Sequence, residues 1–362
     1  MNSEPNSEAE HRFPCNSCGS DLRFDPAARQ LTCDHCGNSQ QIRLAGGIIA
    51  ELDYLAAKDN VLGAEDIAET RVTSCPNCGA QTEFDADLHA TECPFCATPV
   101  VTDTGTHRQI KPQAVLPFGL DEPTARAGVT NWLGSLWFAP NGLKEYARKG
   151  RKLNGIYVPY WTFDADTKSK YSGQRGTHYY ETKTVMRDGK KTQVRVQKTR
   201  WKPKSGRVAR FFDDVLVLAS KSLPKHYTDG LQPWDLSSLE PYQPEYLAGF
   251  RAEGYQVEIN DGYAEAHAHM DAIIHRDVKS DIGGDEQRVD KVKTNVSDVT
   301  FKHILLPVWL AAYKYRGKTY RFVVNGRTGE VQGERPYSMW KIAALVAVIL
   351  AIIAGIVIAN SQ

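Results

Sequence analysis

The chain has 362 residues, of which 41% are hydrophobic and 24% are charged, so it has room for two or three globular domains. The formal net charge of +1 excludes a chain that behaves as a polyelectrolyte over its whole length. All eight cysteines lie between Cys15 and Cys96, which excludes a cysteine nucleophile in the rest of the chain.

Residues 1–12 are acidic and polar, and we expect a disordered leader there because the segment lacks the apolar core of a signal peptide. The cysteines then follow in a sequence unit that occurs twice. In each copy, fourteen residues separate two Cys-x-x-Cys pairs, a glycine follows the first pair, and a Phe-Asp step lies between the pairs. The two sets are Cys15, Cys18, Cys33 and Cys36, and Cys75, Cys78, Cys93 and Cys96.

This spacing is typical of an all-sulfur metal site, because each pair closes a tight turn that points two thiolates at one ion. A thioredoxin-type redox site needs a single pair in a βαβ context, and disulfides need an oxidising compartment. We therefore predict two closed, structural zinc ribbons at residues 13–42 and 71–101, with two Zn²⁺ per chain. Phe24 and Phe84 are the expected core aromatics of the ribbons.

Two connecting segments flank the second ribbon. Residues 43–70 are predicted to be a helical connector, because apolar side chains recur at helical spacing over residues 48–55. Residues 102–109 are predicted to be a linker.

Residues 110–336 have the pattern of one α+β domain with a mostly antiparallel sheet. An acidic start at Asp121 followed by Pro123 predicts a helix, and further helices are predicted over residues 142–149 and 263–278. The side chains expected to face inward from the first helix are Ala127, Val129, Trp132, Leu133 and Leu136.

Strands are predicted at residues 155–163, 179–186, 191–201 and 211–218, and a final meander from residue 304 turns at residues 316–317 and 325–326. Pro159 places the first strand at a sheet edge or a bulge, and Asp188-Gly189 predicts a hairpin. Residues 156–161 and 305–309 share an apolar–Pro–x–Trp pattern, which predicts related places in one sheet with each tryptophan in the core.

The C-terminal residues 337–362 are predicted to be a tail anchor. Residues 342–359 have no polar side chain and are long enough to span a bilayer. Tyr337 and Trp340 precede this span as interfacial aromatics, and the basic residues lie on its N-terminal side. We therefore expect a single-pass protein that contacts membrane lipid through residues 342–359 and keeps its N-terminal bulk in the reducing cytoplasm.

Catalytic motifs are absent from the sequence. No G-x-S-x-G or H-E-x-x-H motif occurs, and Ala312 stands where a Walker A motif ending at residues 317–319 would need glycine. The spacing of His267, His269 and His275 does not place all three on one helix face. We therefore expect no enzyme, and the remaining catalytic alternative would need a cleft that gathers residues such as Asp164, Asp166 and His178.

The charge is unevenly distributed. Residues 168–210 contain fourteen Lys or Arg against two acids, whereas residues 229–290 contain fourteen acids against four bases. The two segments could complement each other within one domain. The basic segment could instead meet anionic lipid or nucleic acid, and the sequence leaves these three alternatives open.

The chain resembles bacterial membrane proteins with two TFIIB-type zinc ribbons. The twin ribbons, the Leu116-Pro-Phe118 lead into the first helix, the strand 155–161 and the C-terminal span carry this resemblance over nearly the whole chain. Such proteins often bear the label primosomal protein N′ (replication factor Y), superfamily II helicase. The resemblance implies a bacterial inner-membrane protein, and some members belong to phage-shock-like envelope stress systems with a phage-shock-protein-A-like partner.

From these features we expect a non-enzymatic, zinc-stabilised, membrane-anchored adaptor that docks a cytoplasmic or membrane protein partner. The alternative is a membrane-tethered nucleic-acid-binding factor of the replication or primosome type, without a helicase motor of its own. The oligomeric state does not follow from the sequence.

Overall fold

The computed structural model describes residues 13–43, 47–83, 90–96, 98–101, 105–138, 153–187, 190–315, 318–334 and 337–360. Several expectations lie outside these residues. They are the leader 1–12, the second ribbon's Phe84, the helix 142–149, and the turns at 188–189 and 316–317.

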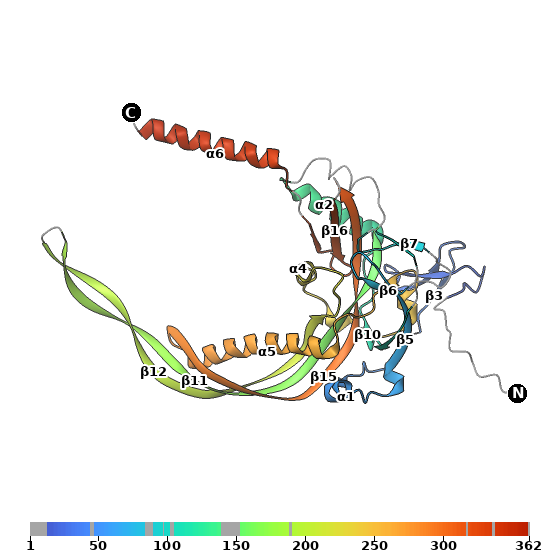
Figure 1. The fold of residues 1–362 in the computed structure, drawn as a ribbon, viewed down its shortest axis with the longest axis horizontal. Helices are drawn as coiled ribbons and strands as arrows, with labels where there is room; N and C mark the ends of the chain where they lie inside the picture. The colour runs from blue at the N-terminus through green and yellow to red at the C-terminus, as the bar shows by residue number, and fades with distance from the viewer. Residues whose placement is uncertain are drawn as a thin grey trace.

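The described chain is an α+β protein built on one nine-stranded sheet, as the sequence predicts (Figure 1). Three long strands form most of it: β11 (Asn154–Arg187), β12 (Lys190–Leu218) and β15 (Glu286–Tyr315). All of their mutual pairings are antiparallel. The shorter strands of the sheet are β4 (Leu52–Asp53), β10 (Ala114–Val115), β13 (Glu240–Pro241), β14 (Arg251–Ala252), β16 (Lys318–Asn325) and β17 (Val331–Gly333).

The hairpin of β11 and β12 is much longer than the sequence predicts. Its register runs from Tyr160↔Leu218 to Arg187↔Lys190, so the separately predicted strands join into two continuous ones. From Gly176↔Glu286 onward, β15 pairs along the other edge of β11. These three strands extend from the body as a long curved arm (Figure 1).

The two prolines of the repeated apolar–Pro–x–Trp pattern occupy equivalent places. In β11 the carbonyl of Pro159 accepts from Ala219 N–H just beyond the end of β12, and in β15 the carbonyl of Pro307 accepts from Gly326 N–H just beyond the end of β16. Neither position needs the N–H that proline lacks. The prediction of a sheet edge or a bulge at Pro159 is wrong, because β11 lies between β12 and β15 and its pairing has no register shift there. The two segments pair with each other antiparallel, and Trp161 and Trp309 are both buried, which confirms the prediction.

Helix α5 (Ile259–Ile282) lies along the inner side of the curved arm (Figure 1). Ala266, Met270, Ile274 and Val278 recur every four residues and are all buried against the sheet. The predicted amphipathic helix is therefore confirmed, although the rest of the acidic segment 229–290 is mainly short turns and the start of β15.

Helix α2 (Glu122–Ser135) begins as predicted, because Asp121 accepts a hydrogen bond from Thr124 N–H as its N-cap. The predicted inward face is only partly right. Ala125 is buried in place of Ala127, which is exposed, while Val129 and Leu133 are buried. The shift follows from the packing of α2 against β16 and β17 on one side only.

The predicted connector and linker hold more strand than expected. Helix α1 (Tyr54–Lys58) starts only after Asp53, its N-cap, so the helix predicted over 48–55 is wrong in its first six residues. The N-terminal strands form three small sheets: β1 (Leu22–Asp25), β2 (Gln30–Cys33) and β3 (Ser39–Gln40); β5 (Ile67–Ser74), β6 (Gln81–Glu83) and β9 (Gly105–Ile110); β7 (Ala90–Glu92) and β8 (Pro99–Val101). The remaining short helices are α4 (Lys225–Asp229), η1 (Ala64–Asp66), η2 (Leu236–Ser238) and η3 (Pro244–Leu247).

Helix α6 (Met339–Asn360) ends the described chain and stands away from the body (Figure 1). Its most apolar window of 18 residues has a mean hydropathy of 3.2, and none of this window is buried. By length and composition this helix can cross a membrane.

Candidate metal centres

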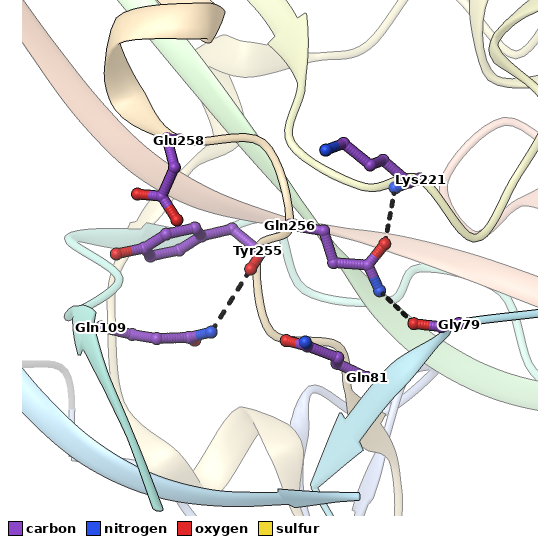
Figure 2. A pocket seen from close by; sticks show the side chains of 7 residues that line it. All are labelled: Gly79, Gln81, Gln109, Lys221, Tyr255, Gln256 and Glu258. Atoms are coloured by element: carbon purple, nitrogen blue, oxygen red, sulfur yellow. Dashed lines mark hydrogen bonds between the residues drawn. The ribbon is translucent and has the colours of Figure 1, made fainter. Parts of the chain in front are cut away.

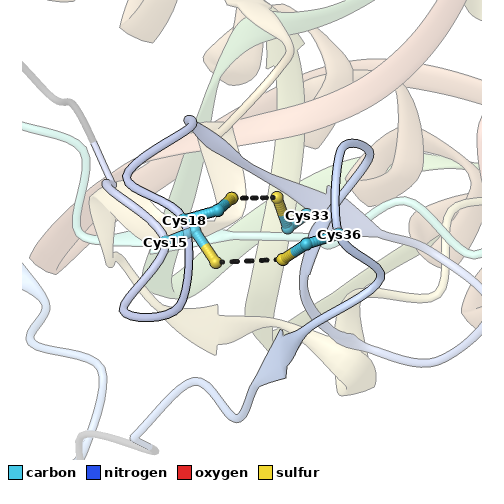
Figure 3. Close-up of side chains that lie close together, drawn as sticks. All are labelled: Cys15, Cys18, Cys33 and Cys36. Atoms are coloured by element: carbon cyan, nitrogen blue, oxygen red, sulfur yellow. Dashed lines mark hydrogen bonds between the residues drawn. The ribbon is translucent and has the colours of Figure 1, made fainter.

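The first four-cysteine cluster is formed by two turns that face each other (Figure 3). Cys15 Sγ lies 3.6 Å from Cys36 Sγ, and Cys18 Sγ lies 3.5 Å from Cys33 Sγ. A disulfide needs about 2.05 Å, so these are four free thiols. Around a tetrahedral ion with Zn–S bonds of about 2.3 Å, sulfur atoms lie about 3.75 Å apart, close to the spacing found here.

Backbone and amide N–H groups support the thiolate form in this cluster. Ser17 N–H and Asn38 Nδ2 donate to Cys15 Sγ over 3.4 and 3.6 Å. The pKa of Cys15 is lowered by the Ser17 N–H, and the pKa of Cys18 is lowered to about 6 by the N–H of Ser20. Gly19 has a φ of 77°, the left-handed conformation that lets the turn close on the sulfurs.

The first cluster is packed onto the body on one side. Phe24 is 1% exposed, and its ring lies 5.4 Å from the ring of Tyr246, so Phe24 is the core aromatic that the sequence predicts. The two turns at residues 16–19 and 34–37 lie on the other side and are exposed, together with Cys18 and Cys36.

The second cluster has the same geometry in a more buried place. Cys75 Sγ lies 3.5 Å from Cys96 Sγ, and Cys78 Sγ lies 3.6 Å from Cys93 Sγ. The hydrogen bond with the Cys93 thiol lowers the pKa of Cys78 to about 5. Cys75, Cys93 and Cys96 are all buried and belong to the hydrophobic core of the body. Phe95, which is fully buried, supplies the aromatic packing here.

A polar pocket of about 350 Å³ lies where the second cluster meets the body (Figure 2). Gln256 spans this junction, because its Nε2 donates to Gly79 O at 3.1 Å and its Oε1 accepts from Lys221 N–H at 3.0 Å. Gln109 donates to Tyr255 O at 3.4 Å on the other side of the pocket. The hydrogen bond from Gln256 to Gly79 thus joins the second cluster to the body beside this pocket.

Glu253 is connected to Gln256 of this junction through Ser222, and no feature of the sequence predicts that Glu253 is buried. It is 2% exposed, and its Oε1 accepts hydrogen bonds from the hydroxyls of Ser220 and Ser222. Burial raises its pKa from 4.5 to about 8, so this carboxyl is neutral at pH 7.

The residues of the catalytic alternative are not brought together. Asp164 is buried and Asp166, two residues along the same face of β11, is exposed, whereas His178 lies fourteen residues from Asp164 along the strand, about 45 Å at 3.3 Å per residue. His178 is held by Glu286 and Gln197.

A third group of possible ligands, Asp164, Asp213 and Asp214, already surrounds a cation. Lys302 Nζ lies 3.2 Å from Asp164 Oδ2 and 2.9 Å from Asp214 Oδ1. Burial alone would lower the pKa of Lys302, but the surrounding carboxylates raise it. The group is therefore a buried ion-pair network.

The histidines of α5 form no group either, as predicted. His267 Nδ1 lies 3.2 Å from Asp271 Oδ2, one turn along the helix. His269 and His275 are exposed and are not part of this pair. Among the described residues, the two cysteine clusters are thus the sites whose chemistry fits a metal ion.

The chain is similar to the uncharacterized protein YdjG of Bacillus subtilis (strain 168), with 25% identity over 334 residues that cover 92% of each chain. The match therefore spans far more than the cysteine-rich segment. No family model matches the chain, and no solved structure matches it.

Proposed function

We propose that the chain is a non-enzymatic, membrane-anchored adaptor whose two zinc ribbons help to hold a docking surface for a protein partner. Its N-terminal bulk lies on the cytoplasmic side of a bacterial plasma membrane, and α6 is its single span. The resemblance of the sequence to double-ribbon proteins of envelope stress systems favours a phage-shock-protein-A-like partner.

The main observation in favour of the membrane anchor is an apolar helix of which no residue in the apolar window is buried. Ile352, Ile356 and Ile358 are each more than half exposed, although a soluble helix would bury such side chains. Each buried methylene contributes about 0.8 kcal/mol, so a bilayer stabilises this helix strongly. Tyr337 and Trp340 are exposed at its start, where interfacial aromatics belong.

Zinc is the ion that best suits both clusters. Four thiolates leave no open position for water or substrate, which is the arrangement of structural zinc sites. A cytoplasmic location keeps the thiols reduced and available to the ion. Cys15, Cys18, Cys33 and Cys36 would hold one ion, and Cys75, Cys78, Cys93 and Cys96 the other.

The exposed turns of the first cluster are the proposed docking surface. The strands of this cluster bury Leu22, Phe24 and Leu31 against the body, so its turns are held rigidly and point outward. The second cluster is enclosed by the core and offers less surface.

The experiment is cross-linking of the full chain in native membranes, followed by identification of the linked protein. Wild type is compared with Ser17→Glu/His35→Glu, which changes the exposed turns but no cysteine. We expect this variant to keep two zinc ions, and we expect the amount of cross-linked partner to fall more than tenfold. Equal recovery by wild type, this variant and Cys15→Ser/Cys75→Ser would contradict the proposal.

A further inference from the structure

The face of the arm opposite α5 is uncovered and basic. Side chains alternate between the two faces of each strand, so the register of β11, β12 and β15 decides which residues share a face. On the inner face, Ser169 Oγ and Thr294 Oγ1 lie 2.9 Å apart, and Val208 packs into the core beneath α5. Their sequence neighbours therefore point outward.

Three cross-strand rows make up the centre of this outer face. The rows, written in the order β12, β11, β15, are Ala209–Lys168–Asn295, Arg207–Lys170–Lys293 and Ser205–Ser172–Lys291. All nine side chains are exposed. We call these nine residues the outer rows.

The middle row places three cations directly opposite one another. Lys170 pairs with Arg207 on one side and with Lys293 on the other, and such partners have Cβ atoms about 5 Å apart. Like charges in this position are destabilising. None of the five bases of the outer rows has an ion pair or hydrogen bond within the described chain. The nearest acids by register are Asp166 in the next row and Asp290 at the bulge beside Lys291.

The acidic helix does not neutralise this face. Arg210 belongs to the inner face and forms two hydrogen bonds of 2.7 and 2.8 Å with Asp277 of α5. Tyr171 likewise donates from the inner face to Asp281. The acidic and basic segments thus complement each other through these inward-facing residues and, further along the arm, through the His178–Glu286 pair, while the outer rows face solvent on the far side of the sheet.

An anionic lipid surface, an acidic protein and a nucleic acid each carry the negative charge that could pair with the outer rows. Figure 1 shows α5 and α6 on the same, concave side of the arm, whereas the outer rows lie on the other face of the sheet. Protein–protein interfaces are depleted in lysine and have an apolar centre, whereas the outer rows contain four lysines and no apolar side chain larger than Ala209. Nucleic-acid interfaces are strongly positive and polar.

We propose that the outer rows bind the phosphate backbone of duplex nucleic acid without reading its sequence. The rows contain no aromatic residue on which an unpaired base could stack. Lysine serves as a point charge for phosphate, and the small serine, alanine and asparagine side chains let the backbone approach. This contact is separate from the turns of the first cysteine cluster.

The test uses the full chain in non-ionic detergent micelles and a fluorescein-labelled DNA duplex of mixed sequence, with binding followed by fluorescence anisotropy over a series of salt concentrations. For wild type, the logarithm of the binding constant should fall with the logarithm of the salt concentration with a slope of about −3 or steeper, since each neutralised phosphate contributes about −0.9. Lys170→Glu/Arg207→Glu/Lys293→Glu should bind more than tenfold more weakly and flatten the slope by about 3.

The matched control is Lys58→Glu/Arg276→Glu/Lys279→Glu, which makes the same change in net charge at exposed bases away from the outer rows. It should keep the wild-type slope, and both variants should keep their zinc and their melting temperature. Failure of wild type to bind at about 50 mM salt would overturn the proposal, as would equal losses in the two variants. The proposal would also be overturned if Lys170→Glu/Arg207→Glu/Lys293→Glu lost binding to phosphatidylglycerol vesicles but kept binding to DNA, because this result would assign the outer rows to lipid.

Discussion

Lys302 places its ammonium nitrogen 3.2 Å from Asp164 Oδ2, and both side chains are almost completely buried in the central sheet. Asp164 lies opposite a bulge of β12, since Phe163 pairs with Val215 and Ala165 pairs with Phe212. Glu51, which precedes β4, reaches the same ammonium at 3.1 Å. A single cation therefore joins β11, β15 and the N-terminal segment.

Replacing Lys302 with methionine should lower the free energy of unfolding by about 3–5 kcal/mol. The apolar stem is kept, but the buried Asp164 carboxylate loses its counter-ion. The measurement is a urea titration of the full chain in micelles, followed by tryptophan fluorescence. The matched control, Lys293→Met, removes an exposed cation from the same strand and should change stability by no more than about 0.5 kcal/mol. Similar losses in the two variants would show that the Lys302 ion pairs add no stability.

Gly262 allows α5 to approach Trp161 closely. A Cβ atom at residue 262 would lie 2.7 Å from Trp161 Cδ1, while Trp161 is itself fixed by a 2.9 Å hydrogen bond to Val257 O. Gly262→Ala should therefore destabilise the protein by about 1–3 kcal/mol, although alanine is the better helix former. Gly134→Ala in α2 is the control, because its Cβ would meet open space, and it should stabilise by up to about 1 kcal/mol. Stabilisation by both changes in a thermal melt would contradict this account.

Local signals in the sequence predicted several parts of the fold correctly. The Cys-x-x-Cys pairs, the cap at Asp121 and the repeated Pro–x–Trp pattern each depend on a few neighbouring residues, and the structure has each of them. The sequence placed Pro159 at a sheet edge or a bulge, and this was wrong because β11 lies between β12 and β15; the proline is tolerated there because β12 ends at Leu218, beside Tyr160.

The long arm and its charged faces could not be predicted in the same way. The arm alternates lysine or arginine with small or β-branched residues, so no continuous apolar run marks strands as long as β11. Lys291 and Lys293 follow an acidic segment, and only the register with Lys170 shows that they share its face. Glu253 was missed because its burial depends on contacts distant in the sequence.

Loss of the second metal should cost more stability than loss of the first. Cys75 is 4% exposed within the core of the body, whereas Cys18 is exposed in the first cluster. Cys18→Ser and Cys75→Ser should each reduce zinc from two ions per chain to one, measured by inductively coupled plasma mass spectrometry. Cys75→Ser should lower the unfolding free energy by about 2 kcal/mol more, because it also leaves polar groups in a buried site. Unchanged zinc in either variant would contradict the assignment of that cysteine as a ligand.

Glu253 should make the protein less stable as the pH rises from about 5 to 8. Its pKa is raised from 4.5 to about 8 by burial, so over this range the unfolded chain releases a proton that the folded chain keeps. The contribution of Glu253 is therefore complete below the unfolded pKa, falls by up to about 1.4 kcal/mol per pH unit, and is lost above the folded pKa.

Glu253→Gln keeps a neutral side chain of the same shape beside Ser220 and Ser222, so it should remove this slope. Unfolding free energies are measured at several pH values with zinc in excess, so that the metal clusters stay filled. Glu258→Gln is the matched control, because Glu258 is exposed a few residues away, and it should keep the wild-type slope. If Glu253→Gln keeps the same slope as wild type, the buried carboxyl is not the group that binds the proton.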